Sequence, residues 1–391
     1  MSAEQIVTYV EEEYDYAVER RHHIHQNPEL SFKEYETTNY IENCMKDWGV
    51  DYERLKSGTG LVAVLEGTVS GKTVALRADI DALPMTEETD ISFKSTKAGI
   101  MHACGHDMHT ATLLGLAHIL SQHKEMIRGR VKFIFQPAEE LFPGGAREVI
   151  AEGFVDDVDV IYGMHVKPAL TYKEVSVHKG TIMAGSYVYK IKVVGKGGHG
   201  SNPSNTKDPV VAASAVVMAL QTIVSRGVYP GTPLVLSTCM IHGGTKGNII
   251  PDFVELEGQI RAFSKEVAMV AEQKIKEVSE GVCAGYGCKA EVLFEDGYDP
   301  LTNHDDNVEL VAEALHEMRS ASFKTLEPEL GGEDFAYFMQ RKPGAYFQVG
   351  IRASEEAPVI PNHNTRFIAD DRALATAMEA YLRILDKEFS L

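Results

Sequence analysis

The sequence is poor in cysteine, in basic residues and in long apolar runs. Its 391 residues include only five cysteines, and 38 Lys and Arg side chains stand against 57 Asp and Glu. The net charge of −19 repels phosphate backbones, and no stretch is rich in Lys or Arg, so we expect no nucleic-acid partner. The longest apolar run, VVAASAVVMAL at 210–220, is well short of the roughly 20 residues that span a bilayer, so we expect no membrane partner.

The N-terminal stretch MSAEQIVTYVEEEYDYAVER lacks a basic segment followed by an apolar one. It does not resemble a secretion signal, and we therefore expect a cytoplasmic protein. The cysteines are odd in number and scattered, which predicts free thiols in a reducing compartment. Cys104 alone has histidine neighbours, and the other four are expected to be small buried hydrophobic residues.

The chain alternates segments typical of strands with segments typical of helices. Apolar, β-branched runs at 60–67, 73–80 and 130–137 predict strands, and 109–123 repeats apolar residues at helical spacing. This alternation predicts an α/β fold with a mostly parallel sheet and helices on its faces. The length predicts two or three domains.

The middle of the chain follows a different order of elements. Strand patterns at 186–195, 232–244, 253–263 and 288–297 are interrupted by helix patterns at 208–227, with Asp208 as N-cap, and at 264–282. Residues 184–298 thus form a β-α-β-β-α-β unit, the order of a ferredoxin-like α+β domain. A strand at 345–350 is expected to rejoin the first sheet, so this domain interrupts a catalytic domain made of residues 1–183 and 299–391.

The stretch HACGHDMH at 102–109 concentrates ligands for a metal ion. Cys104 and His106 precede the helix predicted at 109–123, where a strand-to-helix loop meets the carboxyl edge of the sheet. A Cys-x-His pair alone is equally typical of a polar loop that caps a helix. The other loops at this edge must therefore decide between the two interpretations.

Those loops also end in metal-ligating side chains. Glu139 and Glu140 follow the strand at 130–137, and His165 lies just past an apolar strand at 158–162. One carboxylate of a Glu pair can bind metal while its neighbour transfers protons, although a lone pair is more typical of a solvated acidic loop. Asp79 and Asp81 end a further strand. Residue types that bind metal thus recur at every edge loop of the predicted sheet, which argues against coincidence.

Polar side chains near the C-terminus extend the candidate set. His363 lies in the loop PNHNTRF, and Glu333 and Asp334 follow two glycines in GGEDFAYF. His363 alone would be typical of the surface. Together with the edge loops, these residues could hold one or two divalent ions.

The sequence resembles the M20 metallopeptidase family, in its amidohydrolase branch of aminoacylases, hippurate hydrolases, N-acetyldiaminopimelate deacetylases and auxin-conjugate hydrolases. The resemblance runs nearly end to end. It rests on RRHHIHQNPELSFKEYET, ALRADIDALPM, HACGHDMHTA, FIFQPAEE, GMHV, GKGGHGSNP, GGTKGNIIPD, GGEDFAYF and PNHN. No departure from the ligand pattern of the branch is visible.

The resemblance implies a centre with two metal ions. It makes Cys104 a thiolate that bridges both ions, with His106 and His165 on one and Glu140 and His363 on the other. A bridging thiolate would offset part of the repulsion between the cations. The ligand types suit Zn²⁺ or Mn²⁺, and also Co²⁺ or Ni²⁺.

The resemblance also implies catalytic roles. Glu139 would be the general base, and Asp81 would orient a metal-binding histidine, although Asp79 stands where related branches have that histidine. His199 would stabilise the developing oxyanion; a flexible glycine-rich hairpin is the alternative interpretation of its loop.

Two further residues are candidates for holding the substrate. Asn248 would contact its carboxylate or carbonyl, and Arg261 would clamp the carboxylate or simply be an ordinary strand-surface residue. The family likeness assigns no role to His102 or His109, which are expected to be structural.

We therefore expect a hydrolase with two metal ions that cleaves the amide bond of N-acyl amino acids or related small amides. The inserted domain resembles the family's lid, which also dimerises, so a homodimer is expected. A carboxypeptidase or dipeptidase that uses the same centre is the alternative among enzymes. The alternative outside enzymes is a catalytically silent metal-binding interaction protein, against which the intact Glu139 and all five ligand types argue.

Overall fold

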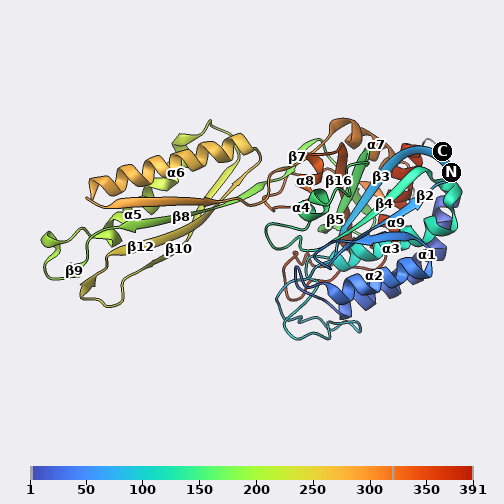
Figure 1. Cartoon of the computed structure of the whole chain (residues 1–391), viewed down its shortest axis with the longest axis horizontal. Helices are drawn as coiled ribbons and strands as arrows, with labels where there is room; N and C mark the ends of the chain where they lie inside the picture. The colour runs from blue at the N-terminus through green and yellow to red at the C-terminus, as the bar shows by residue number, and fades with distance from the viewer. Residues whose placement is uncertain (1–2, 319–320, 390–391) are drawn as a thin grey trace. The chain divides into compact units, whose positions relative to one another are not determined.

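The structure is a computed structural model that describes residues 3–318 and 321–389. The chain divides into two compact units (Figure 1). Unit 1 comprises Met1–Gly180, Thr302–Glu327 and Tyr337–Leu391, and unit 2 comprises Thr181–Leu301 and Pro328–Ala336. Unit 2 is therefore built from segments that interrupt unit 1 in the sequence.

Unit 1 contains an eight-stranded sheet in the order β1-β2-β4-β3-β5-β16-β6-β15. Its strands are β1 (Asp51–Arg54), β2 (Leu61–Glu66), β3 (Val69–Asp79), β4 (Arg128–Gln136), β5 (Val160–Thr171), β6 (Glu174–Ser176), β15 (Ser322–Phe323) and β16 (Gly344–Arg352). The central strands β4, β3, β5 and β16 are parallel, whereas β2 joins β4 and β6 joins β16 in the antiparallel sense. The predicted mostly parallel sheet is confirmed, and β16 rejoins it beside β5.

Helices pack against this sheet and against one another. Those that lie wholly in unit 1 are α1 (Ala3–Gln26), α2 (Tyr35–Asp47), α3 (His106–Gln122), α4 (Ala146–Ala151), α7 (Asp305–His316) and α9 (Ala373–Phe389), with a 3₁₀ turn η1 (Lys124–Met126). Helix α3 contacts α1, α9 and β3, and 14 of its 17 residues are buried. Because α3 is enclosed on all sides, its sequence is apolar around most of its circumference.

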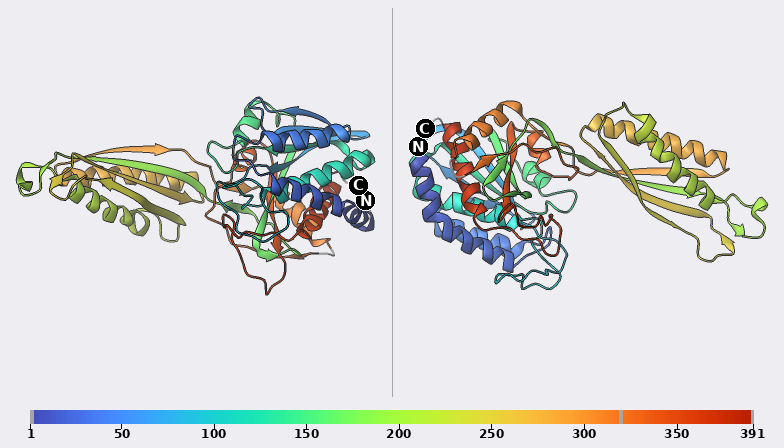
Figure 2. Two further views of the ribbon diagram at one scale, coloured as in Figure 1. Left: turned by 90° about the horizontal axis from the view of Figure 1, so that it is seen from below. Right: turned by 180° about the vertical axis from the view of Figure 1, so that it is seen from behind.

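Unit 2 has the ferredoxin-like order that the sequence predicts. Its main elements are β8 (Gly185–Val194), α5 (Pro209–Thr222), β10 (Leu234–Gly243), β12 (Phe253–Ala262), α6 (Lys265–Gly285) and β13 (Lys289–Glu295). The sheet order β10-β12-β8-β13 is antiparallel throughout, and Figure 2 shows both helices on one face of it. The predicted fold class is confirmed.

Shorter elements complete the two units. A small two-stranded antiparallel sheet of unit 2 pairs β9 (Gly198–His199) with β11 (Ile249–Ile250). The remaining elements are β7 (Gly180–Met183), β14 (Leu301–Asn303), α8 (Ala336–Met339), the 3₁₀ turn η2 (Pro203–Asn205) and the π-helical turn η3 (Ile223–Gly227).

Helix α5 begins where its cap predicts. The Asp208 carboxylate accepts the backbone N–H of Val210 at 2.8 Å, which satisfies a donor that the first helical turn leaves free. Pro209 follows at the first helical position, where its missing N–H costs nothing. The predicted N-cap is confirmed.

The same helical stretch extends beyond the apolar run at 210–220, as the helix pattern at 208–227 predicts. Polar residues interrupt the run after Leu220, but the helical conformation continues, so Pro209–Gly227 is 19 residues long. By length and composition this stretch could cross a membrane. A helix that packs on the core of a soluble protein can have the same length and composition. One face packs on the sheet of unit 2, while Val210, Val211 and Met218 are exposed.

Three local predictions are wrong. Helix α3 begins at His106, three residues earlier than predicted, because Gly105 makes the turn into it. Strand β5 does not end at residue 162 but continues to Thr171, because it pairs with β16, so His165 lies inside the strand. Cys239 is exposed on β10 rather than buried, whereas the other four cysteines are buried and all five are free.

Candidate metal centre

A tight turn brings Cys104 and His106 together at the start of α3. Gly105, between them, has a φ of 96°, a left-handed conformation that residues with a Cβ rarely adopt. A Cβ at this position would lie only 2.3 Å from Cγ2 of Val166. Glycine is therefore required for the turn and for the close approach of β5.

Two groups of candidate ligands share Cys104. Cys104, His106 and His165 have one ligand atom each within 4.8 Å of one another, and so have Cys104, Glu140 and His363. In the first group, Cys104 Sγ lies 3.4 Å from His165 Nε2. In the second group, His363 Nε2 lies 3.0 Å from Glu140 Oε1. The structure thus brings all five predicted metal ligands together in unit 1.

Asp81 contacts a residue of each group. Its backbone and side-chain oxygens lie 3.0 and 3.2 Å from Nδ1 of His106. Its carboxylate also accepts the backbone N–H groups of Glu139 at 3.1 Å and Glu140 at 3.0 Å. Asp81 therefore holds the His106 ring and the Glu139–Glu140 turn in one arrangement, which matches the orienting role expected for it.

The C-terminal loop is tied to the same turn. The backbone N–H of His363 donates to the carbonyl of Ala103 at 2.8 Å, and the Asn362 amide donates to the carbonyl of Cys104 at 2.8 Å. His363 itself has a φ of 61°, unusual for a residue with a side chain. These bonds explain how a histidine more than 250 positions along the chain reaches Cys104.

The donor set fits a divalent cation. Nε2 of His106 is fully buried and has no hydrogen-bond partner among the described residues, so a ligand is needed to satisfy it. Burial raises the pKa of the Cys104 thiol, and the carboxylates of Glu140 and Glu139 raise it further. Burial alone would lower the pKa of His106, but Asp79 and Asp81 raise it to about 10. These shifts show an excess of negative charge, which a cation would compensate.

Glu139 lies beside the two groups and belongs to neither. It is 6% exposed, and its Oε2 is 3.9 Å from Nε2 of His106. Its neighbour Glu140 takes part in the second group, so the two adjacent carboxylates have different environments. Glu139 also has a ligand atom within 4.8 Å of those of His106 and Glu140, so this position allows it either to bind a metal ion or to act as a general base next to one.

Unit 2 carries the other predicted site residues. His199 and Asn248 lie together at the two-stranded β9–β11 sheet, where the Gly200 N–H donates to the Asn248 carbonyl at 2.9 Å. Both side chains are exposed. Arg261 lies eight residues along β12 from Phe253, about 27 Å away at the usual strand rise of roughly 3.4 Å per residue. Phe253 follows β11 by three residues, so within unit 2 Arg261 is remote from the β9–β11 sheet.

Two other predicted acidic residues also belong to unit 2. Glu333 and Asp334 are buried in the short second segment of unit 2. The Glu333 carboxylate accepts the backbone N–H of Phe335 at 2.9 Å.

Sequence reasoning missed the partner of Asp79. Nδ1 of His109 lies 2.5 Å from Oδ1 of Asp79, and Arg77 binds the other oxygen at 2.6 Å. The spacing of His106 and His109, three residues apart on one helix face, was the available signal. His109 was expected to be merely structural.

Comparison with known proteins identifies the family of the chain. Residues 75–387 match the model of peptidase family M20/M25/M40. A protein of Saccharolobus solfataricus named thermostable carboxypeptidase 2 is 40% identical over 374 residues, which cover 95% of each chain. A Bacillus subtilis protein named N-acetyl-L-cysteine deacetylase is 39% identical over 372 residues, covering 94% of this chain and 87% of that protein.

A solved structure extends the likeness to the fold. The Bacillus subtilis YXEP protein, described as a dinuclear metal-binding peptidase of the M20 family, is 33% identical and superposes with a TM-score of 0.85. The match covers 96% of this chain and 98% of that one. Together with the family match, these likenesses show that the chain belongs to peptidase family M20/M25/M40.

Proposed function

We propose that this protein is a metal-dependent amidohydrolase with two divalent ions, which cleaves the amide bond of N-acyl amino acids. The observation that carries the proposal is the position of Cys104 in two ligand groups, with Glu139 beside both. Relatives named for deacetylation of N-acetyl-L-cysteine and for hydrolysis of N-acyl-L-amino acids support the substrate class.

The five ligands divide between the ions as the two groups indicate. Cys104 would bridge both ions, with His106 and His165 holding one and Glu140 and His363 the other. Thiolate, imidazole and carboxylate ligands suit Zn²⁺ and Mn²⁺ best, with Co²⁺ and Ni²⁺ as alternatives. When bound, these ions would polarise the substrate carbonyl and lower the pKa of water towards neutrality.

Glu139 moves the proton. Its carboxylate takes a proton from the attacking water and delivers it to the nitrogen of the leaving amine, so that a carboxylic acid and a free amino acid result. The burial of Glu139 supports this role, because a proton carrier must be shielded from exchange with bulk water.

Residues of unit 2 would complete the site. His199 would donate a hydrogen bond to the developing oxyanion, and Asn248 and Arg261 would hold the substrate. Arg261 is about 27 Å along β12 from Phe253, at the strand end next to the β9–β11 sheet that carries His199, by the strand rise of roughly 3.4 Å per residue. One small substrate cannot span that length, so we propose that His199 and Arg261 of one subunit serve different active sites.

This division of labour requires a homodimer. We propose that residues 184–298 act as lid and dimerisation domain, a role supported by the exposed apolar side chains of α5 and by Met240 and Ile241 on the edge strand β10. Exposed apolar side chains of this kind are what a subunit interface would bury. The five free cysteines fit a reducing compartment, and we propose the cytoplasm.

A carboxypeptidase or dipeptidase is the second candidate. The name of the Saccharolobus solfataricus relative favours it, and the bond to be cleaved is the same: an amide whose nitrogen belongs to an amino acid with a free carboxylate. The two activities differ only in the group on the acyl side. The third candidate, a silent metal-binding protein, does not explain why Glu139 is present.

The test is a substrate panel. Metal-loaded wild-type protein is incubated with N-acetyl, N-benzoyl and N-indoleacetyl amino acids and with dipeptides that share the same C-terminal residue, and release of the amino acid is measured. We expect kcat/KM to be higher for the N-acyl compounds, with no release by Glu139→Gln. Preference for dipeptides would establish the second candidate, and no release from any compound would refute both.

A further inference from the structure

A continuous chain of contacts runs behind the candidate ligand His165. Arg77 donates to Oδ2 of Asp79 at 2.6 Å, and Oδ1 of Asp79 lies 2.5 Å from Nδ1 of His109. Nε2 of His109 accepts the backbone N–H of Val166 at 3.0 Å. The carbonyl of the same Val166 lies 2.7 Å from Nδ1 of His165. Strand β3, helix α3 and strand β5 are linked by this chain.

The contacts determine the position of the proton on both rings. Nε2 of His109 accepts a hydrogen bond from a backbone N–H, so the ring carries its proton on Nδ1 and donates it to Asp79. A carbonyl can only accept, so His165 carries a proton on Nδ1 and donates it to Val166. The remaining nitrogen of neutral His165, Nε2, therefore has a free lone pair on the side of Cys104.

We propose that Asp79 and His109 are positioning residues, which hold β5 so that His165 presents the lone pair of Nε2 to a metal ion. The inference rests on the proposed function. One oxygen of Asp79 is bound to Arg77 and the other to His109, so in this proposal Asp79 acts through the His109 ring and not as a ligand. Its charge supports the Nδ1–H tautomer of His109, which Val166 requires.

Burial makes this chain of contacts rigid. Arg77, Asp79 and His109 are each at most 2% exposed, so no water replaces a lost bond. The His109 and His165 rings are in edge contact, with their centroids 4.7 Å apart. Loss of the His109 ring nitrogens would leave the N–H of Val166 buried without a partner and would free β5 to shift. Partners behind a metal ligand typically affect metal affinity by about 10- to 100-fold.

The test separates one metal site from the other. Binding of Zn²⁺ to metal-free protein is titrated by calorimetry for wild type and for His109→Phe, which keeps the ring and loses both bonds. We expect two binding events in wild type, of which His109→Phe weakens one by about 10- to 100-fold and spares the other. The unaffected binding event is the one at the site that contains Glu140 and His363, because these two residues do not contact His109.

Controls distinguish positioning from general damage. His118→Phe makes the same change further along α3 and should leave both binding events intact. If His109→Phe does not fold, His109→Gln keeps an amide oxygen for the Val166 N–H and is expected to show an intermediate loss. Unchanged affinities in a folded His109 variant would overturn the inference, whereas wild type without two binding events would overturn the proposed function.

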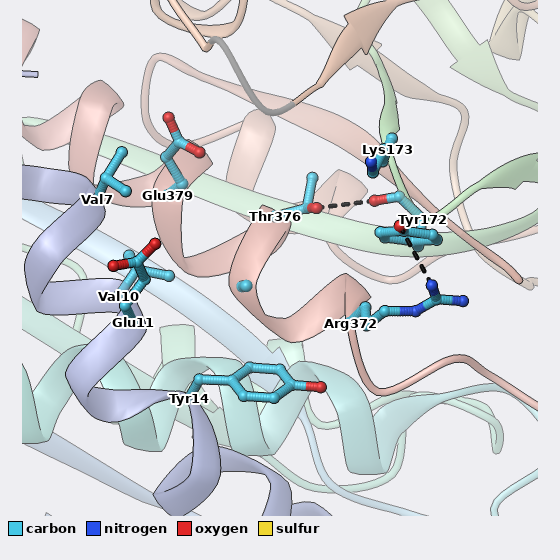
Figure 3. A pocket seen from close by; sticks show the side chains of 10 residues that line it. Val7, Val10, Glu11, Tyr14, Tyr172, Lys173, Arg372, Thr376 and Glu379 are labelled. Atoms are coloured by element: carbon cyan, nitrogen blue, oxygen red, sulfur yellow. Dashed lines mark hydrogen bonds between the residues drawn. The ribbon is translucent and has the colours of Figure 1, made fainter. Parts of the chain in front are cut away.

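A separate cavity in unit 1 carries a second inference. It has a volume of about 350 Å³ and lies between α1, α9 and the turn from β5 to β6 (Figure 3). Val7, Val10 and Ala375 give it apolar walls, and the Tyr14 and Tyr172 rings flank it. A cavity of this size and lining is typical of a small-molecule site.

Charges of opposite sign face each other across this cavity. Figure 3 shows Glu11 and Glu379 on one side and Lys173 and Arg372 on the other. Glu379 is bound by Arg383, and Arg372 by Asp370. Glu11 and Lys173 make no ion pair with any residue in the described parts of the chain, 3–318 and 321–389, so these two charges remain available to a ligand.

We propose that this cavity binds a free α-amino acid with an apolar side chain. Lys173 would hold the carboxylate, Glu11 the ammonium group, and the valines the side chain. That such a ligand is also the product of the reaction rests on the proposed function. The binding itself does not, so the two can fail independently.

Calorimetry with L-leucine tests the assignment. We expect saturable binding to wild type that is weakened at least about 10-fold in Lys173→Met and in Glu11→Gln, because each removes a charge-assisted contact. Leu analogues that lack the ammonium group or the carboxylate should bind as weakly. Lys33→Met, an exposed change outside the cavity, should have no effect.

Two outcomes would overturn this assignment. One is the absence of L-leucine binding to wild type. The other is binding that survives Lys173→Met but disappears when metal is removed with a chelator, which would place the amino acid at the metal centre.

Discussion

His25 on α1 and Asp107 on α3 form a buried ion pair, with Nδ1 of His25 2.9 Å from Oδ2 of Asp107. Arg21 binds the same oxygen at 3.0 Å, and Glu87 lies 3.4 Å from the other nitrogen of His25. Asp107 directly follows His106, so the N-terminal helix anchors the turn that carries two candidate metal ligands.

This pair predicts a loss of stability at alkaline pH. Burial alone lowers the pKa of His25, but the carboxylates of Asp107 and Glu87 raise it to about 9 from 6.5. A raised pKa means that the stabilisation is complete below pH 6.5 and is lost as the pH rises through 9. Over this interval, the free energy of unfolding measured in urea should fall by about 3 kcal/mol more for wild type than for His25→Gln. Equal losses in the two proteins would contradict the pairing.

Removal of the shared thiolate should remove metal and activity together. Cys104→Ser is expected to lose both ions to a large extent, because both ligand groups contain this side chain. Metal content by mass spectrometry and hydrolysis rate are measured on the same samples, with exposed Cys239→Ser as the matched control. His106→Ala should also lose metal and activity. Full metal occupancy in an inactive Cys104→Ser protein would exclude the bridging role.

The adjacent glutamates should respond differently to the same change. Glu139→Gln is expected to retain metal and fold and to lose at least about 10²-fold in kcat, as a missing general base predicts. Glu140→Gln should instead weaken metal binding, because Glu140, unlike Glu139, belongs to a ligand group that contains Cys104. Near-normal turnover by metal-loaded Glu139→Gln would remove this residue from the mechanism.

Subunit mixing tests whether His199 serves the partner's site. Glu139→Gln and His199→Ala proteins, each inactive, are mixed under conditions that allow exchange. If His199 acts on the partner, each heterodimer has one site with both defects and one with neither, so activity returns to at most about half of its sites.

The control mixture combines two defects of unit 1. Glu139→Gln with His106→Ala leaves one defect in every site and should stay inactive. No recovery in the His199 mixture, despite demonstrated exchange, would mean that His199 serves its own subunit.

The hydrophobic pattern predicts the framework of both units. Alternation along 186–195 identifies β8, because one face of that sheet is covered by helices and the other is not. Asp208 and Pro209 mark the start of α5 through local chemistry alone. Such signals are contained within a few neighbouring residues, so they can be recognised without tertiary structure.

Long-range pairing explains what the pattern could not show. The first turn of α3 is polar in sequence, a pattern typical of a loop. Its residues His106, Asp107 and His109 are nevertheless all buried, because each pairs with a residue from another element. His165 and Lys167 are polar and interrupt the apolar pattern of β5. The sequence pattern therefore does not show that the strand continues beside β16. Only the family likeness connected His363 to Cys104, since no local pattern links positions so far apart.

The place of β16 in the sheet has a consequence for biosynthesis. This strand lies between β5 and β6, yet about 180 residues separate the end of β5 from its own end, roughly 10 to 40 seconds of translation at about 5–20 residues per second. Until it arrives, the backbone N–H and C=O groups along one side of β5 have no partner strand, which is the surface that draws nascent chains into aggregates. A ribosome that stalls within unit 2 therefore leaves this edge open, and chaperone demand should fall only when the C-terminal strand emerges.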